Sequence, residues 1–359
     1  MNFTYSPVQP LDREWPERCW QYLNRKSIPP RSLGYLEEIA VQVATIQRTL
    51  EPDLGHPSVV IAAGDHGVYA EKVSYAAQEV TWQHSLALAR GEGAAGLLAR
   101  QYDLPCQVVD VGVKYDFPVQ SGILNCKVVW GTENIALQPG MSVAQTLQAM
   151  DYGRDFVRLL ALAGQKGIIL GEMGIANTTP AAALTAHLLG LTPQEVVGEG
   201  TGLSPAALEN KRQVVGRILA RHKGIEDPIE VMAAMGGAEL AFIAGAALEA
   251  AGQGLVVLVD GVIVTAALLV AQRIDAGLSS YLIAGHQSPE PAHKLQLEAL
   301  GLRPILKLGM RLGEASGALV AWPIVRSALT IFRELSTCAE EGMGEVAADI
   351  LAAKEGRDS

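Results

Sequence analysis

Two isolated glutamates in glycine-rich segments are the residues best suited to chemistry in this sequence. Glu172 follows the apolar run "GIIL" and lies in "LGEMGIANTTP", and Glu314 lies far downstream in "LGEASG". Glycine allows a ligand to approach the backbone closely, so each carboxylate has room for a partner. Each acid could also do no more than face solvent or stabilise the start of the following helix. Which of these two roles each glutamate has depends on what surrounds it.

The segment after Glu172 has the features of an anion site. Thr178 or Thr179 can cap a helix there, and Pro180 suits the first turn of that helix. The free N–H groups of such a turn, with Gly174 nearby, form a seat for a phosphate. Because Glu172 also ends an apolar strand pattern, we favour a functional site over a capped helix with a solvated acid.

A second bare loop, "GEGTGLSPAALENK", repeats this pattern. Its glycines precede Ser204, which is expected to cap a helix that begins at Pro205. Lys211 lies two turns along that helix and could bring a positive charge back toward an anion. A lysine on a helix is more often simply solvated, so the pattern leaves both interpretations open.

The segment "AGHQSPEPAHK" raises the question of a metal. His286, His293 and Glu290 are metal-ligand types, but their spacing is not H-E-x-x-H, and two prolines break any helix that would align them. We therefore favour Ser288 as an anion contact, with Pro291 fixing the turn. No metal site is expected.

Two further motifs have local structural explanations. "GEGAAG" at 91–96 matches a dinucleotide-binding pattern but follows a helical segment, where that fingerprint requires a strand. We expect a helix–helix junction there. Asp65 and His66 are neighbours on extended chain and point in opposite directions, so a structural turn is expected. No P-loop sequence is present.

The order of the segments predicts an α/β fold. Short apolar runs that end in glycine or aspartate alternate with longer helical patterns, at 58–67, 107–113, 167–174, 255–261 and 281–288. Continuous apolar strands between helices indicate a doubly wound, mostly parallel sheet. Ligands bind such sheets at the carboxyl ends of the strands, which is where the motifs above lie.

Both ends of the chain have a different pattern. Residues 33–50 form an amphipathic helical stripe, and 316–335 and 338–354 are helical in pattern as well. We expect residues 1–55 together with 316–359 to form a small helical domain. Residues 56–315 would then form the α/β substrate-binding and catalytic domain.

Composition narrows the class of protein. A net charge of -10 argues against a nucleic-acid surface, which needs a basic patch. The apolar runs are too short to span a bilayer. Four scattered cysteines without C-x-x-C, and an N-terminus without a signal pattern, predict a cytoplasmic protein with reduced thiols.

Taken together, the motifs resemble those of the nicotinate-nucleotide:dimethylbenzimidazole phosphoribosyltransferase family. The resemblance runs in order from about residue 24 to about residue 335, and it rests on "AGDHGV", "EVTWQ", "GTENIALQPGM", "GEMGIANTTPAAAL", "GEGTGL", "MGGAELAFIAGA", "DGVIVTAALL", "GHQSPEPAHK" and "LGMRLGEASGA". Arg31, Ala176 and Ala315 stand where glycine would be expected. Alanine at 315 tightens the backbone beside Glu314.

The resemblance implies a specific reaction. Nicotinate mononucleotide and 5,6-dimethylbenzimidazole, or a related lower-ligand base, would give α-ribazole 5′-phosphate and nicotinate in cobalamin nucleotide-loop assembly. It also implies a parallel α/β domain with a small helical domain from both chain ends, and a homodimer with sites near the subunit interface. No metal or organic cofactor is implied.

The resemblance also assigns roles to residues. Glu314 would be the general base that takes a proton from the attacking benzimidazole, a role worth about 10² to 10⁴ in rate, and Glu172 would share its pocket and orient base or ribose. The phosphate and ribose would meet Gly174, Ile175, Ala176, Asn177, Thr178, Gly200, Thr201, Gly202, Lys211 and Ser288. Asp260 would border the nucleotide, and the benzimidazole would lie near Ser74, Gln83, Met173 and Leu312.

Two other classes of protein fit the sequence less well. An NAD-dependent oxidoreductase would need a strand-linked G-x-G-x-x-G and an acid about 20 residues further on, and neither occurs in place. A non-catalytic nucleotide-binding protein would gain nothing obvious from two carboxylates beside an anionic ligand. The sequence therefore favours a phosphoribosyltransferase.

Overall fold

A computed structural model describes residues 3–198, 200 and 202–343 of the 359-residue chain. The chain divides into two compact units, of which the first comprises Met1–Gln9 and Gly55–Ala321 and the second Pro10–Leu54 and Trp322–Ser359. The boundary near residue 321 falls inside a helix, six residues beyond the position expected from the sequence, and the first nine residues belong with the sheet. Ser6 ties these first residues to α10 (Ala238–Gly252) of the first unit, because its N–H and its hydroxyl both donate to the Glu249 carboxylate at 2.8 Å.

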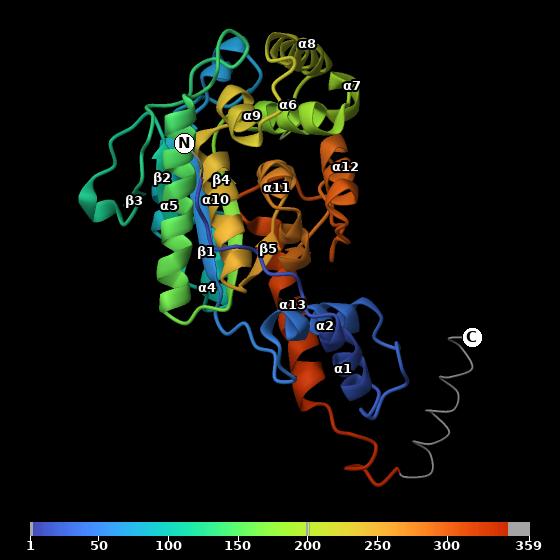
Figure 1. The fold of residues 1–359 in the computed structure, drawn as a ribbon. Coiled ribbons are helices and arrows are strands. Elements are labelled where there is room, and N and C mark those ends of the chain that lie inside the picture. Colours follow the sequence, from blue (N-terminus) through green and yellow to red (C-terminus); the bar gives the residue numbers. More distant parts are fainter. Residues whose placement is uncertain (1–2, 199, 201, 344–359) are drawn as a thin grey trace. The chain divides into compact units, whose positions relative to one another are not determined.

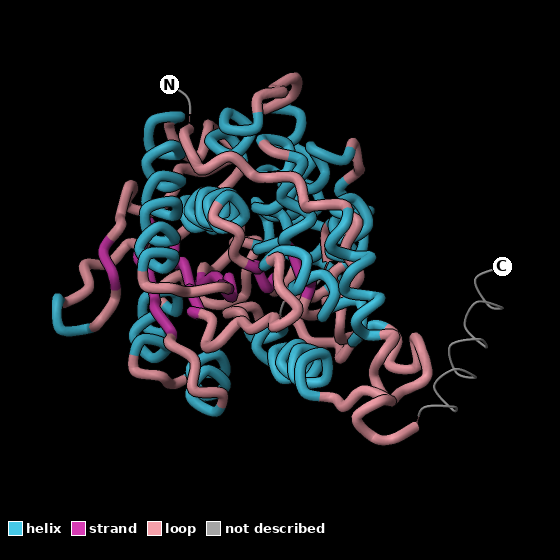
Figure 2. The backbone as a smooth tube through the Cα atoms, turned by 60° about the horizontal axis from the view of Figure 1, so that its bottom comes forward, coloured by secondary structure: helices cyan, strands magenta, loops and turns pink. Residues whose placement is uncertain are grey.

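The first unit contains a six-stranded sheet in the order β3-β2-β1-β4-β5-β6. All strand pairs are parallel, which confirms the α/β prediction. Helices flank the sheet, and its strands lie inside the unit (Figures 1 and 2). The strands are β1 (Ser58–Gly64), β2 (Cys106–Gly112), β3 (Leu124–Asn125), β4 (Gly167–Met173), β5 (Val256–Val259) and β6 (Leu282–Ala284).

The strand order reverses between β1 and β4. Chain connections leave this point toward opposite edges of the sheet, so a crevice opens at the carboxyl ends of the two strands. Ala62 pairs with Glu172 and Ala63 with Met173 in the register of β1 and β4. Glu172 therefore lies at the position where doubly wound sheets bind their ligands.

Helices of the first unit connect these strands. Helix α10 contacts β1, β2, β4 and β5 and also packs along α5, which lies beside it in Figure 1. The two helices approach closely because a Cβ at Gly153 would lie 2.1 Å from the carbonyl oxygen of Phe242. The helices are α3 (Val80–Ala89), α4 (Gly93–Gln101), α5 (Val143–Leu162), α6 (Thr178–Leu189), α7 (Pro193–Val196), α8 (Pro205–Arg221), α9 (Pro228–Met235), α10 (Ala238–Gly252), α11 (Val262–Ile274) and α12 (Pro291–Leu300), with short 3₁₀ turns at Gly67–Glu71, Val119–Ser121 and Ala276–Tyr281.

The second unit is helical. It contains α1 (Glu14–Leu23), α2 (Tyr35–Gln47) and the part of α13 (Ser316–Glu334) that begins at Trp322. Lys26 joins the N- and C-terminal segments, because its ammonium donates to the carbonyl oxygens of Arg333 at 3.1 Å and Leu335 at 2.7 Å. The helix predicted at 338–354 is absent from its described part, since residues 338–342 form turns and Gly342 has a φ of 71°. Residues 344–354 lie outside the described residues.

None of the helices described by the structure is both long and apolar enough to cross a lipid bilayer. Helix α10 is apolar nearly all round, yet it is buried against the sheet and α5. Its hydrophobicity is therefore that of a core helix.

Candidate active site

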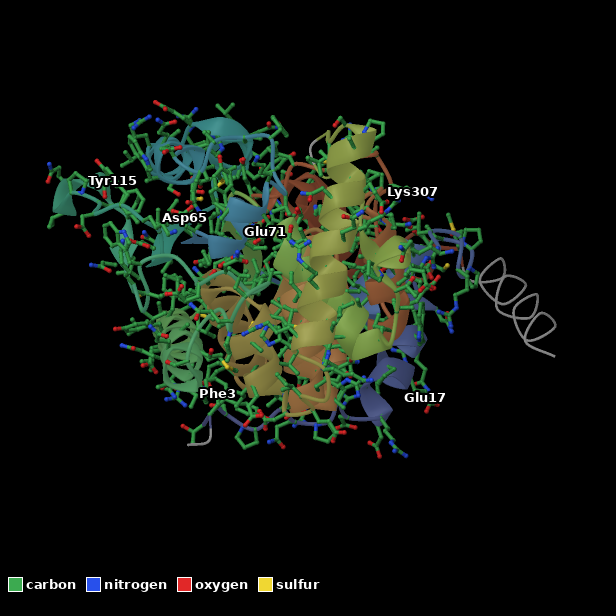
Figure 3. The ribbon with its side chains drawn as sticks, turned by 90° about the horizontal axis from the view of Figure 1, so that it is seen from above. Phe3, Glu17, Asp65, Glu71, Tyr115 and Lys307 are labelled. Carbon is green, nitrogen blue, oxygen red and sulfur yellow. The ribbon has the colours of Figure 1, made fainter. Side chains whose placement is uncertain are left out.

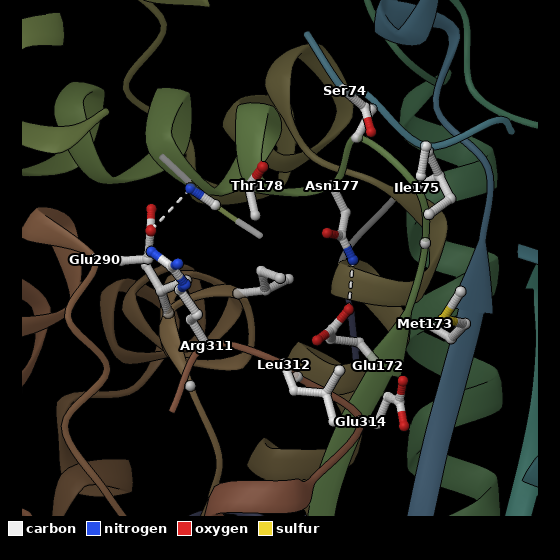
Figure 4. Close-up of a pocket in the computed structure, with 18 of the residues that line it drawn as sticks. Ser74, Glu172, Met173, Ile175, Asn177, Thr178, Glu290, Arg311, Leu312 and Glu314 are labelled. Carbon is white, nitrogen blue, oxygen red and sulfur yellow. Dashed lines mark hydrogen bonds between the residues drawn. The ribbon is translucent and has the colours of Figure 1, made fainter. Parts of the chain in front are cut away.

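A pocket of about 260 Å³ opens beside the carboxyl end of β4. Its walls come from α3 and the segment before it, from the turn between β4 and α6, from α8 and the start of α11, and from loops near residues 200, 286–290 and 311–314. Glu172 and Glu314 both line it, on the opposite side from Glu290 in Figure 4. The two glutamates singled out in the sequence thus lie in one cavity.

Most of the residues assigned by resemblance line this pocket. They are Ser74, Glu172, Met173, Gly174, Ile175, Ala176, Asn177, Thr178, Gly200, Lys211, Ser288, Leu312 and Glu314. Gln83, Gly202 and Asp260 do not line it. Thr201 lies outside the described residues.

Glu172 is the last residue but one of β4 and is almost fully buried. The side-chain amide of Asn177 donates to its Oε2 (Figure 4). Burial, and then the nearby charge of Asp260, raises the pKa of Glu172 to about 8. Glu172 therefore carries a proton near neutral pH in the ligand-free protein.

The loop that carries Glu314 has an unusual backbone. Gly313, Glu314 and Ala315 have consecutive φ values of 88°, 63° and 65°, a left-handed conformation that costs a non-glycine residue roughly 1–2 kcal/mol. The loop packs directly on β4, because a Cβ at Gly171 would lie 2.5 Å from the amide nitrogen of Ala315. A Cβ at Gly313 would lie 2.5 Å from Oε1 of Glu172. Close packing against β4 therefore sets the position of Glu314.

A buried lysine lies at the start of α6. Lys211, on α8, is 1% exposed, and its Nζ donates to Oγ1 of Thr178 at 2.7 Å. Burial lowers the pKa of Lys211 to about 8, and the charge of Glu290 opposes this shift. Of the two interpretations that the sequence left open, the buried lysine is the one observed. Its ammonium lies beside the first turn of α6.

The start of α6 differs from the expected cap. Asn177 occupies the N-cap position, and neither Thr178 nor Thr179 caps the helix with its side chain. The Asn177 amide is engaged with Glu172 and the Thr178 hydroxyl with Lys211. The polar side chains of this turn therefore serve the pocket, while the N–H groups of Asn177 and Thr179 donate to the carbonyl oxygens of Gly174 and Ala176. By contrast, Ser204 caps α8 as predicted, by accepting from the N–H of Ala207.

Ser288, which lines the pocket, is held by the buried His293. The N–H of Ser288 donates to Nδ1 of His293 at 2.9 Å, and Nε2 of His293 lies 3.2 Å from Oγ1 of Thr265. Burial lowers the pKa of His293 to about 3, so the ring is neutral. Both ring nitrogens are occupied, and the described residues contain no cluster of metal-ligand side chains.

Asp260 lies beneath the pocket. Its Oδ1 accepts from the N–H groups of Gly317 at 2.7 Å and Ala318 at 3.2 Å. It therefore caps the first turn of α13, and the next residue, Gly261, lines the cavity in its place. This contact anchors the helix that follows the Glu314 loop.

The turn after β1 is structural, in agreement with the sequence. Oδ2 of Asp65, labelled in Figure 3, accepts from the N–H of Lys114 at 2.8 Å. Nε2 of His66 lies 2.7 Å from Oε1 of Glu239. The adjacent side chains thus turn to different partners. "GEGAAG" likewise joins α3 to α4, as predicted.

Sequence reasoning missed His84 as a lining residue. His84 lines the pocket, whereas its neighbour Gln83 is exposed. Successive residues on a helix point about 100° apart, so only one of the two can face the cavity. Val80, four residues before His84 on α3, also lines the pocket, so the helical period of α3 is the signal that could have distinguished the two residues. Arg311 and Tyr75 also line the pocket without having been singled out.

This site joins a cation at one end to two carboxyl groups at the other. Lys211 and the first turn of α6 suit a phosphate, and Glu172 and Glu314 suit a centre that gains positive charge. The class of protein defined by this fold and site is confirmed by a family model described as Phosphoribosyltransferase, which matches residues 8–343.

Named relatives narrow the class. The nicotinate-nucleotide–dimethylbenzimidazole phosphoribosyltransferase of Thermus thermophilus is 48% identical over 316 residues, which cover 88% of this chain and 94% of that protein. The enzyme of the same name from Cupriavidus necator is 40% identical over 339 residues, covering 94% and 98%. A crystal structure of the Thermus thermophilus enzyme superposes with a TM-score of 0.88 at 44% identity, covering 92% of this chain and 99% of that one. This chain belongs to the nicotinate-nucleotide–dimethylbenzimidazole phosphoribosyltransferase family.

Proposed function

We propose that this enzyme transfers the 5-phosphoribosyl group of nicotinate mononucleotide to 5,6-dimethylbenzimidazole or a related lower-ligand base. The products are α-ribazole 5′-phosphate and nicotinate, for cobalamin nucleotide-loop assembly. The observation that carries the proposal is the presence of Glu172, Glu314 and the buried Lys211 around one cavity. Family membership and the named relatives support the same reaction.

The phosphate of the nucleotide binds at the start of α6 in this proposal. Lys211 supplies positive charge there, and residues Gly174 to Thr178, Gly200 and Ser288 line the same pocket. Thr201 and Gly202 are further proposed phosphate contacts. The lysine is held by Thr178 before the ligand arrives. Because the site is already assembled, little conformational entropy is lost on binding.

Bond exchange takes place at C1′ of the ribose. The C1′–nitrogen bond to nicotinate breaks, and its electron pair returns to the pyridine nitrogen, so the leaving group needs no acid catalyst. The benzimidazole nitrogen forms the new bond, and the proton on its other nitrogen passes to Glu314. Positive charge that develops on the ribose is stabilised by the carboxyl groups nearby.

Glu172 orients the ribose or the base. In the ligand-free protein it holds a proton, since burial raises its pKa to about 8. The cationic nicotinate ring favours the ionised carboxylate, so nucleotide binding converts Glu172 from a neutral group to a charged one. Ser74, Met173 and Leu312 form the wall for the benzimidazole, with Gln83 and Asp260 outside the cavity lining.

For the assembly, we propose a cytoplasmic homodimer of subunits with an α/β domain and a small helical domain. Exposed apolar side chains support association of two copies, among them Tyr75 at 67% and Trp130 at 52% exposure. The division into two units supports the domains, and four free cysteines support a reducing compartment. Light scattering of the purified protein tests the dimer; a monomer at all concentrations would contradict it.

A coupled product assay tests the reaction. The purified protein is incubated with nicotinate mononucleotide, with or without 5,6-dimethylbenzimidazole. Nicotinate release that requires the base, with one α-ribazole 5′-phosphate formed per nicotinate, supports the proposal. Release that is independent of the base indicates a hydrolase, and binding without release indicates a nucleotide-binding protein. Either result rejects the transfer reaction.

A further inference from the structure

His84 contacts the proposed base directly. Its Nε2 lies 2.7 Å from Oε1 of Glu314, with the His84 side chain 30% exposed and that of Glu314 7% exposed. Both residues line the pocket. In the described part of the chain, Oε2 of Glu314 is buried without a hydrogen-bond partner. Nε2 of His84 is likewise without a hydrogen-bond partner there, so the contact is a close ion-pair approach to Oε1 rather than an aligned hydrogen bond.

The surroundings of His84 hold its ring in this place. A Cβ at Gly93, whose φ is +71°, would lie 3.2 Å from Cε1 and 3.3 Å from Nε2 of His84. Thr81, one turn earlier on the same helix, accepts a hydrogen bond at 3.0 Å from the N–H of Ile175 and so ties α3 to the turn that follows Glu172. The glycine turn "GEGAAG", which is a helix–helix junction, therefore provides the space for the imidazole.

We infer that His84 is a positioning residue for Glu314. Its imidazole holds Oε1 and stabilises the ionised carboxylate, so that Oε2 is the oxygen that takes the proton from the attacking base. The inference rests on the proposed function, because it assigns His84 a task in that same proton transfer. The step moves one proton from the benzimidazole nitrogen to Oε2, and His84 keeps its own.

The charges around His84 support this role. The contact with Glu314 raises the pKa of His84 above its ordinary value against the opposing effect of burial, so the imidazolium form is more populated near neutral pH. Arg90 and Glu92, on the turn after α3, are half exposed and pair with each other at 2.8 Å. Glu172 from β4 and Arg311 from the Glu314 loop line the same pocket. Glu314 is the charged group in direct contact with the ring.

Replacement of His84 tests the inference. We expect His84→Ala to lower kcat about 10- to 100-fold, the range for losing a close partner of a buried charged group, with KM for nicotinate mononucleotide within about twofold of wild type. The acid limb of the kcat–pH profile should change, because His84, whose pKa the contact with Glu314 raises, no longer titrates beside the base. His84→Gln, which keeps an N–H donor, should recover part of the rate.

Controls separate a positioning role from a structural one. His56→Ala changes a histidine whose side chain is 60% exposed and should leave kcat unchanged, and thermal unfolding verifies that each variant is folded. If His84→Ala folds and has the wild-type kcat and pH profile, the inference is overturned. The proposed function is not affected by that result, because the wild-type enzyme still catalyses the transfer. Equal losses in His84→Ala and His84→Gln with an unmoved acid limb would overturn it as well. A wild-type protein without base-dependent nicotinate release rejects the proposed function, and the role of His84 with it.

Discussion

Glu172 and Glu314 line one pocket from different elements, the end of β4 and the loop before α13. The Glu314 loop approaches Glu172 so closely that Gly313 has no room for a side chain, since a Cβ there would lie 2.5 Å from Oε1 of Glu172. The two carboxyl groups differ in environment. Glu172 is buried against Asn177, whereas Glu314 contacts the partly exposed His84. Different environments allow two glutamates to hold different protonation states and serve different roles.

Lys211→Ala should weaken nucleotide binding more than turnover. The buried ammonium lies beside the first turn of α6, and the loss of one charge-assisted contact to phosphate corresponds to an increase in KM of about 10- to 100-fold. Steady-state kinetics with nicotinate mononucleotide as the varied substrate measures this. Lys294→Ala, at a side chain that is 67% exposed, is the matched control. An unchanged KM in Lys211→Ala would exclude the phosphate role.

The stability of the ligand-free protein should fall as pH rises from about 5 to about 9. The folded-state pKa of Glu172 is about 8, above its ordinary value of 4.5, so the folded state binds the extra proton. Its stabilising contribution is complete below the unfolded pKa and is lost as pH passes the folded one. Thermal unfolding of wild type and Glu172→Gln across this range measures the effect. The variant should show a flatter dependence; identical slopes would contradict the assignment.

Nucleotide binding should release protons near pH 7. The positively charged nicotinate ring lowers the pKa of the buried Glu172 carboxyl, which is protonated in the free protein. Titration calorimetry in buffers of different ionisation enthalpy counts the protons released. Glu172→Gln should release fewer, and an equal number in both proteins would show that Glu172 does not meet the ring.

Gly171→Ala should displace the Glu314 loop, which packs directly on Gly171 of β4. The added methyl would lie 2.5 Å from the amide nitrogen and 2.7 Å from Cβ of Ala315, and overpacking of this kind costs about 1–3 kcal/mol. We expect a lower melting temperature and a fall in kcat that exceeds the change in KM. Gly216→Ala, whose added methyl would lie 3.8 Å from Cγ of Pro193 and which is within α8, should be neutral or stabilising. Wild-type kcat in Gly171→Ala would show that Glu314 is placed independently of β4.

The sheet was largely predictable from sequence. Five strands are continuous apolar runs because both faces of a parallel sheet are covered. Strand β3 was missed because it has two residues, Leu124 and Asn125, and both are exposed. The order of the strands, and with it the crevice beside Glu172, comes from pairings between distant segments that no local pattern encodes.

The candidate site was predictable where its residues lie on glycine turns. The turn after Glu172 and the loop of Glu314 both have distinctive local sequences. By contrast, the capping role of Asp260 and the contact of His84 depend on α13 and on a loop far away in the sequence. The sequence of its helix allows Lys211 to be either solvated or buried. It is buried because α8 packs near the start of α6, where its ammonium donates to Thr178.

Glu314→Gln tests the central claim most directly. The amide keeps the size of the side chain but cannot take the proton, so kcat with 5,6-dimethylbenzimidazole should fall about 10²- to 10⁴-fold while both substrates still bind. An N1-methylated benzimidazole has no proton to lose and should react at similar rates with wild type and variant. A Glu314→Gln enzyme that turns over 5,6-dimethylbenzimidazole at the wild-type kcat would contradict the account.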